Sequence, residues 1–138
     1  MLSMPDSPTV RVRRYAQSKG WLYGNVETQR GPRIKVDLYH AWDFLLLAGE
    51  GCDVPDGEPT LVAVQVTSSS NRGSRWKRLA SNNTVPHWLA DGTRGGALVT
   101  TGTKKPRGGK PIKVIRWTTL GLSPSGELVQ VRDDWYEG

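Results

Sequence analysis

The chain of 138 residues has one cysteine and no long apolar run. A single cysteine, Cys52, excludes an internal disulfide and any zinc site built from several cysteines, and it makes a cytosolic setting the default. The longest apolar stretch, from Phe44 to Ala48, has the length of a strand and is far too short to span a membrane. We therefore expect a cytoplasmic protein.

Acidic residues are nearly absent from one long part of the chain. Between Pro59 and Gly126, Asp91 is the only acid. The same stretch holds eleven basic residues: Arg72, Arg75, Lys77, Arg78, Arg94, Lys104, Lys105, Arg107, Lys110, Lys113 and Arg116. Together with a net charge of +6, this asymmetry favours a polyanionic partner such as nucleic acid, because neutralised phosphates release condensed counterions. The alternative is a basic, soluble surface without a ligand.

Length and patterning predict one domain over residues 9–138, preceded by a flexible segment, residues 1–8. A first helix is expected from a cap at Thr9 to a stop at Gly20. Strands are expected at residues 21–28, 34–48 with a break near His40, 61–67, 95–101, 113–118 and 128–132. A basic helix is expected over about residues 71–81, and a Lys/Arg/Gly/Pro-rich loop over residues 102–111.

The run from Leu61 to Thr67 is the clearest strand. With a period of two residues, the valines at positions 62, 64 and 66 face one side, and Ala63, Gln65 and Thr67 face the other. A run this apolar is normally central in a sheet and buried on both faces. Gln65 and Thr67 are then buried polar groups that need partners.

Asp43 poses the same problem, because it lies within an apolar segment that has no Arg or Lys. Burying an unpaired carboxylate is strongly unfavourable. A divalent cation would satisfy Asp43 and Gln65 together, since hard cations take oxygen ligands. The alternative is a buried aspartate that is hydrogen-bonded to the backbone or paired with a base from elsewhere in the chain.

A set of short motifs resembles a known nuclease superfamily. In chain order they are Glu27, Asp37-Leu38-Tyr39, Asp43, Gln65-Val66-Thr67, Arg75-Trp76-Lys77 and Trp88-Leu89. Over residues 10–118 the chain resembles the PD-(D/E)XK superfamily, in particular its small Holliday-junction-resolvase-like, Mrr-like and VRR-NUC-like branches, phage-encoded versions included. The resemblance implies a restriction-endonuclease-like α/β fold: a mixed four- to five-stranded sheet flanked by helices, one before the sheet and one after the third strand.

The resemblance also implies a metal site. Asp43 matches the central metal-binding aspartate, and Gln65 matches the acidic or glutamine position of the (D/E)-x-K strand. Val66 would offer its backbone carbonyl, and Glu27 matches the upstream glutamate that closes the site. The implied protein is a Mg²⁺-dependent DNA endonuclease, with Mn²⁺ able to substitute. By the same analogy it is a homodimer that resolves branched DNA such as Holliday junctions, in the host cytoplasm if a phage encodes it.

Two positions depart from the family pattern. Gln65 replaces an acid, which Mrr-like members tolerate, and Thr67 stands where the catalytic lysine belongs. Because hydrolysis requires an activated water and a stabilised phosphate, another residue must replace the lysine. Lys77 is the first candidate, on the helix after the motif strand, and Lys35 is the second. Lys77 is otherwise a phosphate-contacting or solvated base. Asp37 either assists the metal or lies in a turn.

Seven basic residues are candidates for contact with DNA: Arg72, Arg75, Arg78, Lys104, Lys105, Arg107 and Lys110. Arginine suits the geometry of phosphate, which favours the three on the predicted helix as phosphate clamps. The four in the predicted loop would lie along a DNA backbone or enter a groove. The alternative for that loop is a flexible, solvated segment.

Two other functions stay open. The first is a restriction-like or nicking nuclease that acts on ordinary duplex DNA. The second is a non-catalytic DNA-binding protein derived from the nuclease fold, which Gln65 and Thr67 favour. Glu27 and Asp43 argue against the second, because a pure binder gains nothing from acids close to phosphates.

Overall fold

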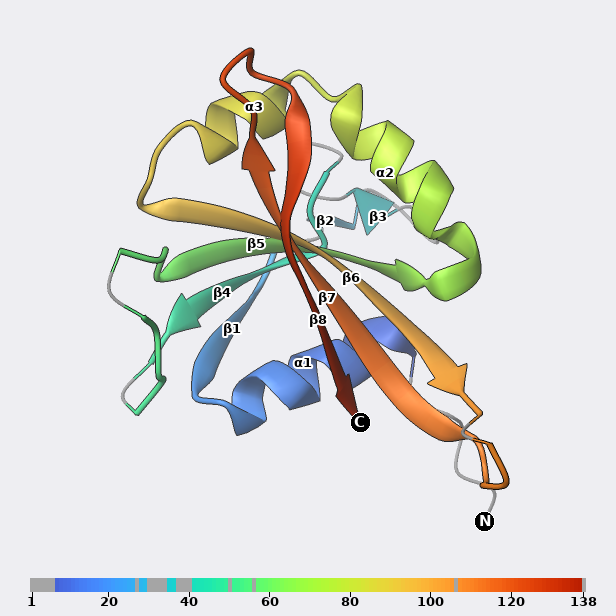
Figure 1. The fold of residues 1–138 in the computed structure, drawn as a ribbon. Helices are drawn as coiled ribbons and strands as arrows, with labels where there is room; N and C mark the ends of the chain where they lie inside the picture. Colours follow the sequence, from blue (N-terminus) through green and yellow to red (C-terminus); the bar gives the residue numbers. More distant parts are fainter. Residues whose placement is uncertain are drawn as a thin grey trace.

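The computed structural model describes residues 7–26, 28–29, 35–36, 41–49, 51–55, 57–105 and 107–137, with the backbone alone for residues 28–29 and 35–36. Within these residues the protein is α/β, with a six-stranded mixed sheet flanked by helices (Figure 1).

The main sheet has the strand order β1-β4-β5-β6-β7-β8. The strands are β1 (Trp21–Asn25), β4 (Phe44–Ala48), β5 (Leu61–Ser68), β6 (Arg94–Lys104), β7 (Ile112–Leu122) and β8 (Leu128–Glu137). Neighbouring strands are antiparallel except for β5 and β6, which are parallel. Two short strands, β2 (Thr28–Gln29) and β3 (Lys35–Val36), form a separate antiparallel pair.

The helices cover both faces of the sheet. Helix α1 (Pro8–Ser18) precedes the sheet and lies against one face, whereas α2 (Arg72–Ala80) and α3 (Thr84–Leu89) lie on the other (Figure 1). The short 3₁₀ turn η1 (Ser69–Asn71), α2 and α3 connect β5 to β6, as a parallel pair requires. A helix before the sheet and a helix after its third strand are thus confirmed.

The sheet has six strands, more than the predicted four to five, and its C-terminal strands are longer than predicted. Strands β6 and β7 continue their pairing as far as Lys104 and Ile112, into the segment predicted to be a loop. Backbone pairing needs no apolar side chains where both faces of a hairpin meet solvent, so the polar sequence gave no strand signal there. Strand β8 also continues past the predicted end at residue 132, as far as Glu137, which pairs with Val114 of β7.

The N-terminal helix begins earlier than predicted. Ser7, not Thr9, is the N-cap, and its side chain accepts a hydrogen bond from the N–H of Val10. Pro8 occupies the first turn, where its missing N–H has no cost, so Ser7 and Pro8 belong to the fold rather than to a loose terminus. The predicted stop at Gly20 is confirmed, since that residue adopts a φ of 95°.

Strand β5 is central and buried, as its sequence predicts. Val64 and Val66 face α1 in one hydrophobic cluster, and Ala63 faces α2 and α3 in the other, with Leu79 and Leu98. Gln65 and Thr67 share the face of Ala63 and therefore lie under the α2–α3 layer. Among the described helices, none has the length and apolar character needed to cross a bilayer.

Candidate active site

Asp43 and Gln65 meet at the junction of β4 and β5. Asp43 lies directly before β4, and its N–H donates to the carbonyl of Val64 at 2.8 Å. The side-chain Nε2 of Gln65 donates to Asp43 Oδ2 at 2.7 Å, and the backbone N–H of Val66 donates to the same oxygen at 2.6 Å. Asp43 is only 8% exposed and Gln65 only 1%. Two residues 22 positions apart thus form one buried polar pair.

The amide oxygen of Gln65 is the unusual atom of this pair. Gln65 Nε2 is satisfied by Asp43 and, at 3.3 Å, by the carbonyl of Val66. Gln65 Oε1 is buried and has no hydrogen-bond partner among the described residues. Because buried polar atoms are nearly always paired, this oxygen calls for a donor or a cation that the described side chains do not supply.

Thr67 continues the polar face of β5. It is buried and stands opposite Thr100 of β6 in the parallel register, as Gln65 stands opposite Leu98. Thr67 lies two residues beyond Gln65 on the same face, where the family lysine would be. Its hydroxyl carries no charge, so the cation for this site must come from another element.

Helix α2 presents Arg75, rather than Lys77, to the sheet. Leu79 is buried and marks the inner side of the helix. Arg75 lies one turn before Leu79 on that side, about 40° away around the axis, and is half-buried. Lys77 lies about 160° from Leu79 and is exposed. No contact among the described residues brings the Lys77 ammonium to Asp43 or Gln65.

Arg72, the first residue of α2, forms side-chain hydrogen bonds with residues of β7 and β8. Its Nη2 donates to Thr118 Oγ1 at 3.1 Å and to Gln130 Oε1 at 3.0 Å. Burial, and then the neighbouring charge of Arg116, lower the pKa of Arg72 below its ordinary value. These bonds tie α2 to β7 and β8, and contact with a phosphate stays a prediction for this residue.

Asp133 of β8 is the centre of the same polar group. Arg116 donates to both of its carboxylate oxygens, at 2.7 to 3.0 Å, and Thr118 donates to Oδ1 at 2.9 Å. The hydrogen bonds from Arg116 are the main reason that the pKa of Asp133 lies below its ordinary value, although burial opposes them. This ion pair links β7 and β8 through their side chains, in addition to their backbone pairing.

The basic candidates gather at one edge of the sheet. Because β5 and β6 are parallel, their carboxyl ends share an edge. Helix α2 starts just beyond the end of β5. Four exposed basic residues lie at the end of β6 or in the β6–β7 turn: Lys104, Lys105, Arg107 and Lys110. Gln65 and Thr67 lie toward the same end of β5, so the polar pair and these bases share one edge.

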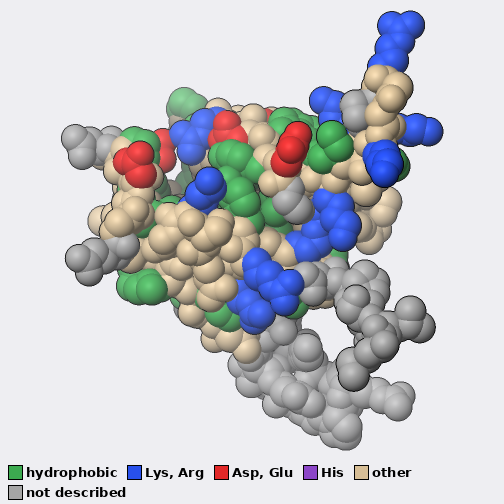
Figure 2. Space-filling view, turned by 90° about the horizontal axis from the view of Figure 1, so that it is seen from below, with side chains coloured by type: hydrophobic (Ala, Val, Ile, Leu, Met, Phe, Trp, Pro, Cys, Tyr) green, Lys and Arg blue, Asp and Glu red, His purple; other side chains and the backbone are tan. Residues whose placement is uncertain are grey.

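Sequence reasoning missed a second group of bases, on α1. Arg11, Arg13 and Arg14 lie within about one turn of helix, and the run Arg-Val-Arg-Arg is the signal that would have revealed them. The guanidinium of Arg11 donates to the carbonyl of Val114, and that of Arg13 lies 5.3 Å from the ring of Tyr23. Figure 2 looks onto the α1 face and shows Lys and Arg side chains in its middle and right-hand part, along a projecting arm and at its upper left.

Several predicted site residues lie outside the described residues. These are Glu27, Asp37 and the side chain of Lys35. Within the described part of the chain, no three His, Cys, Asp or Glu residues come together. The geometry therefore bears on Asp43, Gln65 and Val66, which it brings together, while the contribution of Glu27 stays a prediction.

No protein-family model matches the chain, and neither a curated protein sequence nor a solved structure matches it significantly.

Proposed function

We propose that the protein is a Mg²⁺-dependent DNA endonuclease whose active site is built around Asp43 and Gln65. The observation that carries this proposal is the buried pair at the β4–β5 junction, in which Gln65 Oε1 has no partner among the described residues. A buried carboxylate beside an unpaired acceptor is unfavourable in a structure that only needs to be stable. A cation site, in contrast, requires a buried carboxylate and an acceptor oxygen that is free to bind the ion.

The donor set fits a hard divalent cation. Asp43, Gln65 and Val66 contain a carboxylate, an amide oxygen and a backbone carbonyl, and Mg²⁺ prefers oxygen ligands. Binding would require the Gln65 amide to turn, because its Nε2 rather than its Oε1 now faces Asp43 and the Val66 carbonyl. Glu27 remains the predicted fourth contributor. When bound, the metal would lower the pKa of a coordinated water and offset negative charge on the scissile phosphate.

The chain's own residues supply position and positive charge. The N–H of Val66 and the amide of Gln65 fix the orientation of the Asp43 carboxylate. Arg75, on the inner side of α2, takes the place of Lys77 as the candidate cation in our proposal, since a guanidinium can donate two hydrogen bonds to a phosphate. The bases at the carboxyl ends of β5 and β6 would hold the DNA backbone at that edge.

Branched DNA is the proposed first substrate, and a homodimer the proposed assembly. Both rest on the family resemblance. A two-fold dimer would present two such sites to two strands of a junction.

A non-catalytic DNA-binding protein is the second candidate. It is favoured by the hydrogen bonds that already occupy Asp43 Oδ2 and by the outward position of Lys77. In that case Asp43 and Gln65 would serve only to join β4 and β5.

Cleavage assays separate the two candidates. A labelled four-way junction and a linear duplex of the same sequence would be incubated with the protein in Mg²⁺, in Mn²⁺ or in EDTA. We expect cleavage that requires the metal and is faster on the junction. Asp43→Asn, which preserves shape and removes the charge, should reduce the rate by about a hundredfold or more while DNA binding persists.

Glu127→Gln is the matched control, because it removes a carboxylate from the exposed β7–β8 turn. In the same assay, Arg75→Ala should slow cleavage strongly and Lys77→Ala only weakly. Binding of both DNAs without cleavage in either metal would establish the binder. Full activity of Asp43→Asn would remove this pair from the mechanism.

A further inference from the structure

A cavity of about 330 Å³ lies on the α1 face of the sheet, opposite the face that carries Gln65 and Thr67. It is bounded by α1, by the loop before β5 and by β7 and β8. Its size lies at the lower end of the range of ligand pockets, roughly 300 to 1,000 Å³. No local sequence pattern predicts this cavity, because its lining comes from segments that are distant along the chain.

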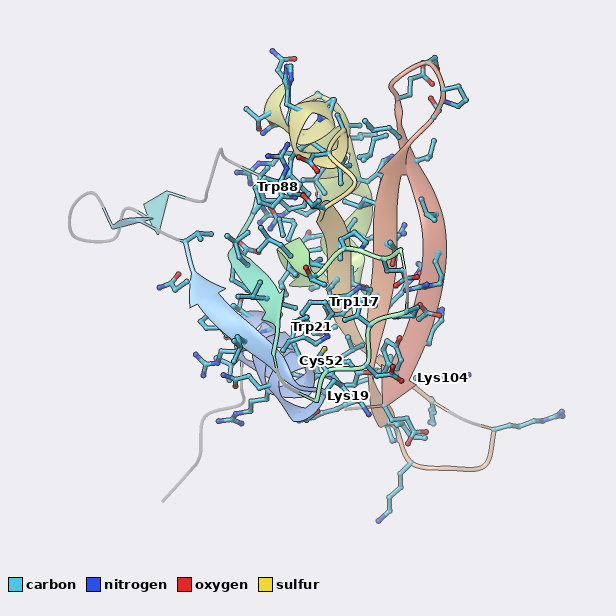
Figure 3. All side chains as sticks on the ribbon, turned by 90° about the vertical axis from the view of Figure 1, so that its left-hand side faces the viewer. Lys19, Trp21, Cys52, Trp88, Lys104 and Trp117 are labelled. Carbon is cyan, nitrogen blue, oxygen red and sulfur yellow. The ribbon has the colours of Figure 1, made fainter. Side chains whose placement is uncertain are left out.

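Aromatic side chains form much of its wall. Four of them line the cavity: Tyr15, Trp21, Trp117 and Tyr136. The rings of Tyr15 and Tyr136 lie 4.8 Å apart and are inclined by 30°. In Figure 3 the labelled Trp21 and Trp117 lie close together beside Cys52 and Lys19, whereas Trp88 lies apart, at the helices of the other face. Such walls favour a flat, aromatic ligand, which gains contact by stacking.

The space depends on a glycine in the sheet. Gly95 of β6 lines the cavity, and a Cβ at this position would lie 3.1 Å from Pro59 and 3.5 Å from Val62. A larger residue would push against the loop that closes the cavity. Because Gly95 has no side chain, the loop can pack against the sheet at Pro59 without a clash, and the cavity lies next to this contact.

The charges of the lining balance. The lining contains two basic and two acidic side chains: Lys19, Arg132, Asp53 and Glu58. Arg132 is already engaged, since it donates to Glu58 at 2.7 Å and to Asp134 at 2.9 Å. An anionic ligand would have to compete with both carboxylates for this guanidinium. The lining therefore suits a neutral ligand that carries polar groups at its edge, where Thr119 and the charged side chains offer hydrogen bonds.

We propose that this cavity binds a nucleobase, a neutral and flat heteroaromatic ring with a polar edge. The base would arrive either as a free nucleoside or as an unpaired base of a nucleic acid strand. Both sources present the same ring to the aromatic wall. The proposal does not depend on cleavage, because the cavity and the Asp43–Gln65 pair lie on opposite faces of the sheet.

Calorimetric titration tests the free source, with adenosine and thymidine as ligands and ribose as the sugar control. We expect saturable binding of at least one nucleoside and none of ribose. Thr119→Phe, which fills the cavity, should weaken binding by about tenfold or more, the loss of one stacked base. Thr103→Phe is the matched control, because Thr103 lies exposed near the far end of β6.

A labelled single strand of deoxyadenosines tests the other source, against an abasic strand of equal length. The proposal is supported, with the strand as the source of the base, if Thr119→Phe binds the deoxyadenosine strand more weakly than Thr103→Phe does. The two variants should bind the abasic strand equally. Trp117→Leu serves as a second variant if Thr119→Phe does not fold, and it should show the same loss. Equal binding of ribose and nucleosides, or no effect of either variant on any ligand, would overturn the proposal.

Discussion

The ionisation of one residue on the α1 face, Tyr15, makes the free energy of unfolding depend on pH. Tyr15 is half-buried and packs against Tyr136. Burial, followed by the charge and hydrogen bond of Tyr136 and the charge of Asp134, raises the pKa of Tyr15 from 10.0 to about 12. The phenolate is disfavoured in the folded protein, so folding holds a proton that the unfolded chain releases at lower pH.

The free energy of unfolding should therefore fall as the pH rises from 10 to about 12. Tyr15→Phe should make that decline shallower, by less than about 2.7 kcal/mol over the window, because solvent screens a half-buried group. Urea denaturation at pH 8 and at several points above pH 10 would measure the change. Tyr23→Phe is the control, and an equal effect of both variants would show that Tyr15 has no special part in the alkaline transition.

At the level of the elements, most of the fold could be predicted from hydrophobic period and turn residues. The alternation in β5 placed Gln65 and Thr67 on one face, and the position of Asp43 beside an apolar strand identified it as a buried acid. The side of α2 that faces the sheet is marked in the sequence by its two large apolar residues, Trp76 and Leu79, and both pack into the core. Their spacing turns Lys77 outward and Arg75 inward, so the choice of Lys77 as the catalytic cation did not use it.

The contact between β6 and the layer of α3 depends on a second glycine. A Cβ at Gly96 would lie 2.8 Å from Trp42 Cη2 and 3.0 Å from Leu89 Cδ2, and Trp42 is fully buried. Gly96→Ala should lower the free energy of unfolding by about 1 to 3 kcal/mol, because a packed ring cannot move away freely. Thermal or urea denaturation would measure the change.

Gly73→Ala is the matched comparison, since nothing lies within 4 Å of a Cβ on this residue of α2. It should be neutral or stabilise the protein by up to about 1 kcal/mol, because alanine restricts the unfolded chain and favours helix. If Gly96→Ala were as stable as Gly73→Ala, the close packing of Trp42 against β6 would not be a real constraint.

Over the described part of the molecule, the fold brings two groups of bases from the acid-poor stretch to one edge of the sheet. The parallel pairing of β5 and β6 brings the start of α2 and the β6–β7 turn to one edge, although about 25 residues of crossover separate the two strands. Composition could predict a polyanionic partner but not this geometry, because the edge is created by strand order. The bases of α1 lie outside residues 59–126, so an argument based on the acid-poor stretch alone did not include them.

If DNA binds at this edge, the contribution of its basic residues to the affinity can be measured from the salt dependence of the binding constant. Each phosphate contact adds about −0.9 to the slope of log K against log salt concentration on duplex DNA. Replacing Lys104, Lys105, Arg107 and Lys110 together with glutamine should make that slope shallower by up to about 3.6, and binding should weaken most at low salt. Arg94→Gln, at the start of β6 and therefore at the opposite end of the sheet, should change it little. An unchanged slope in the fourfold variant would place the DNA elsewhere, with the arginines of α1 as the next surface to neutralise.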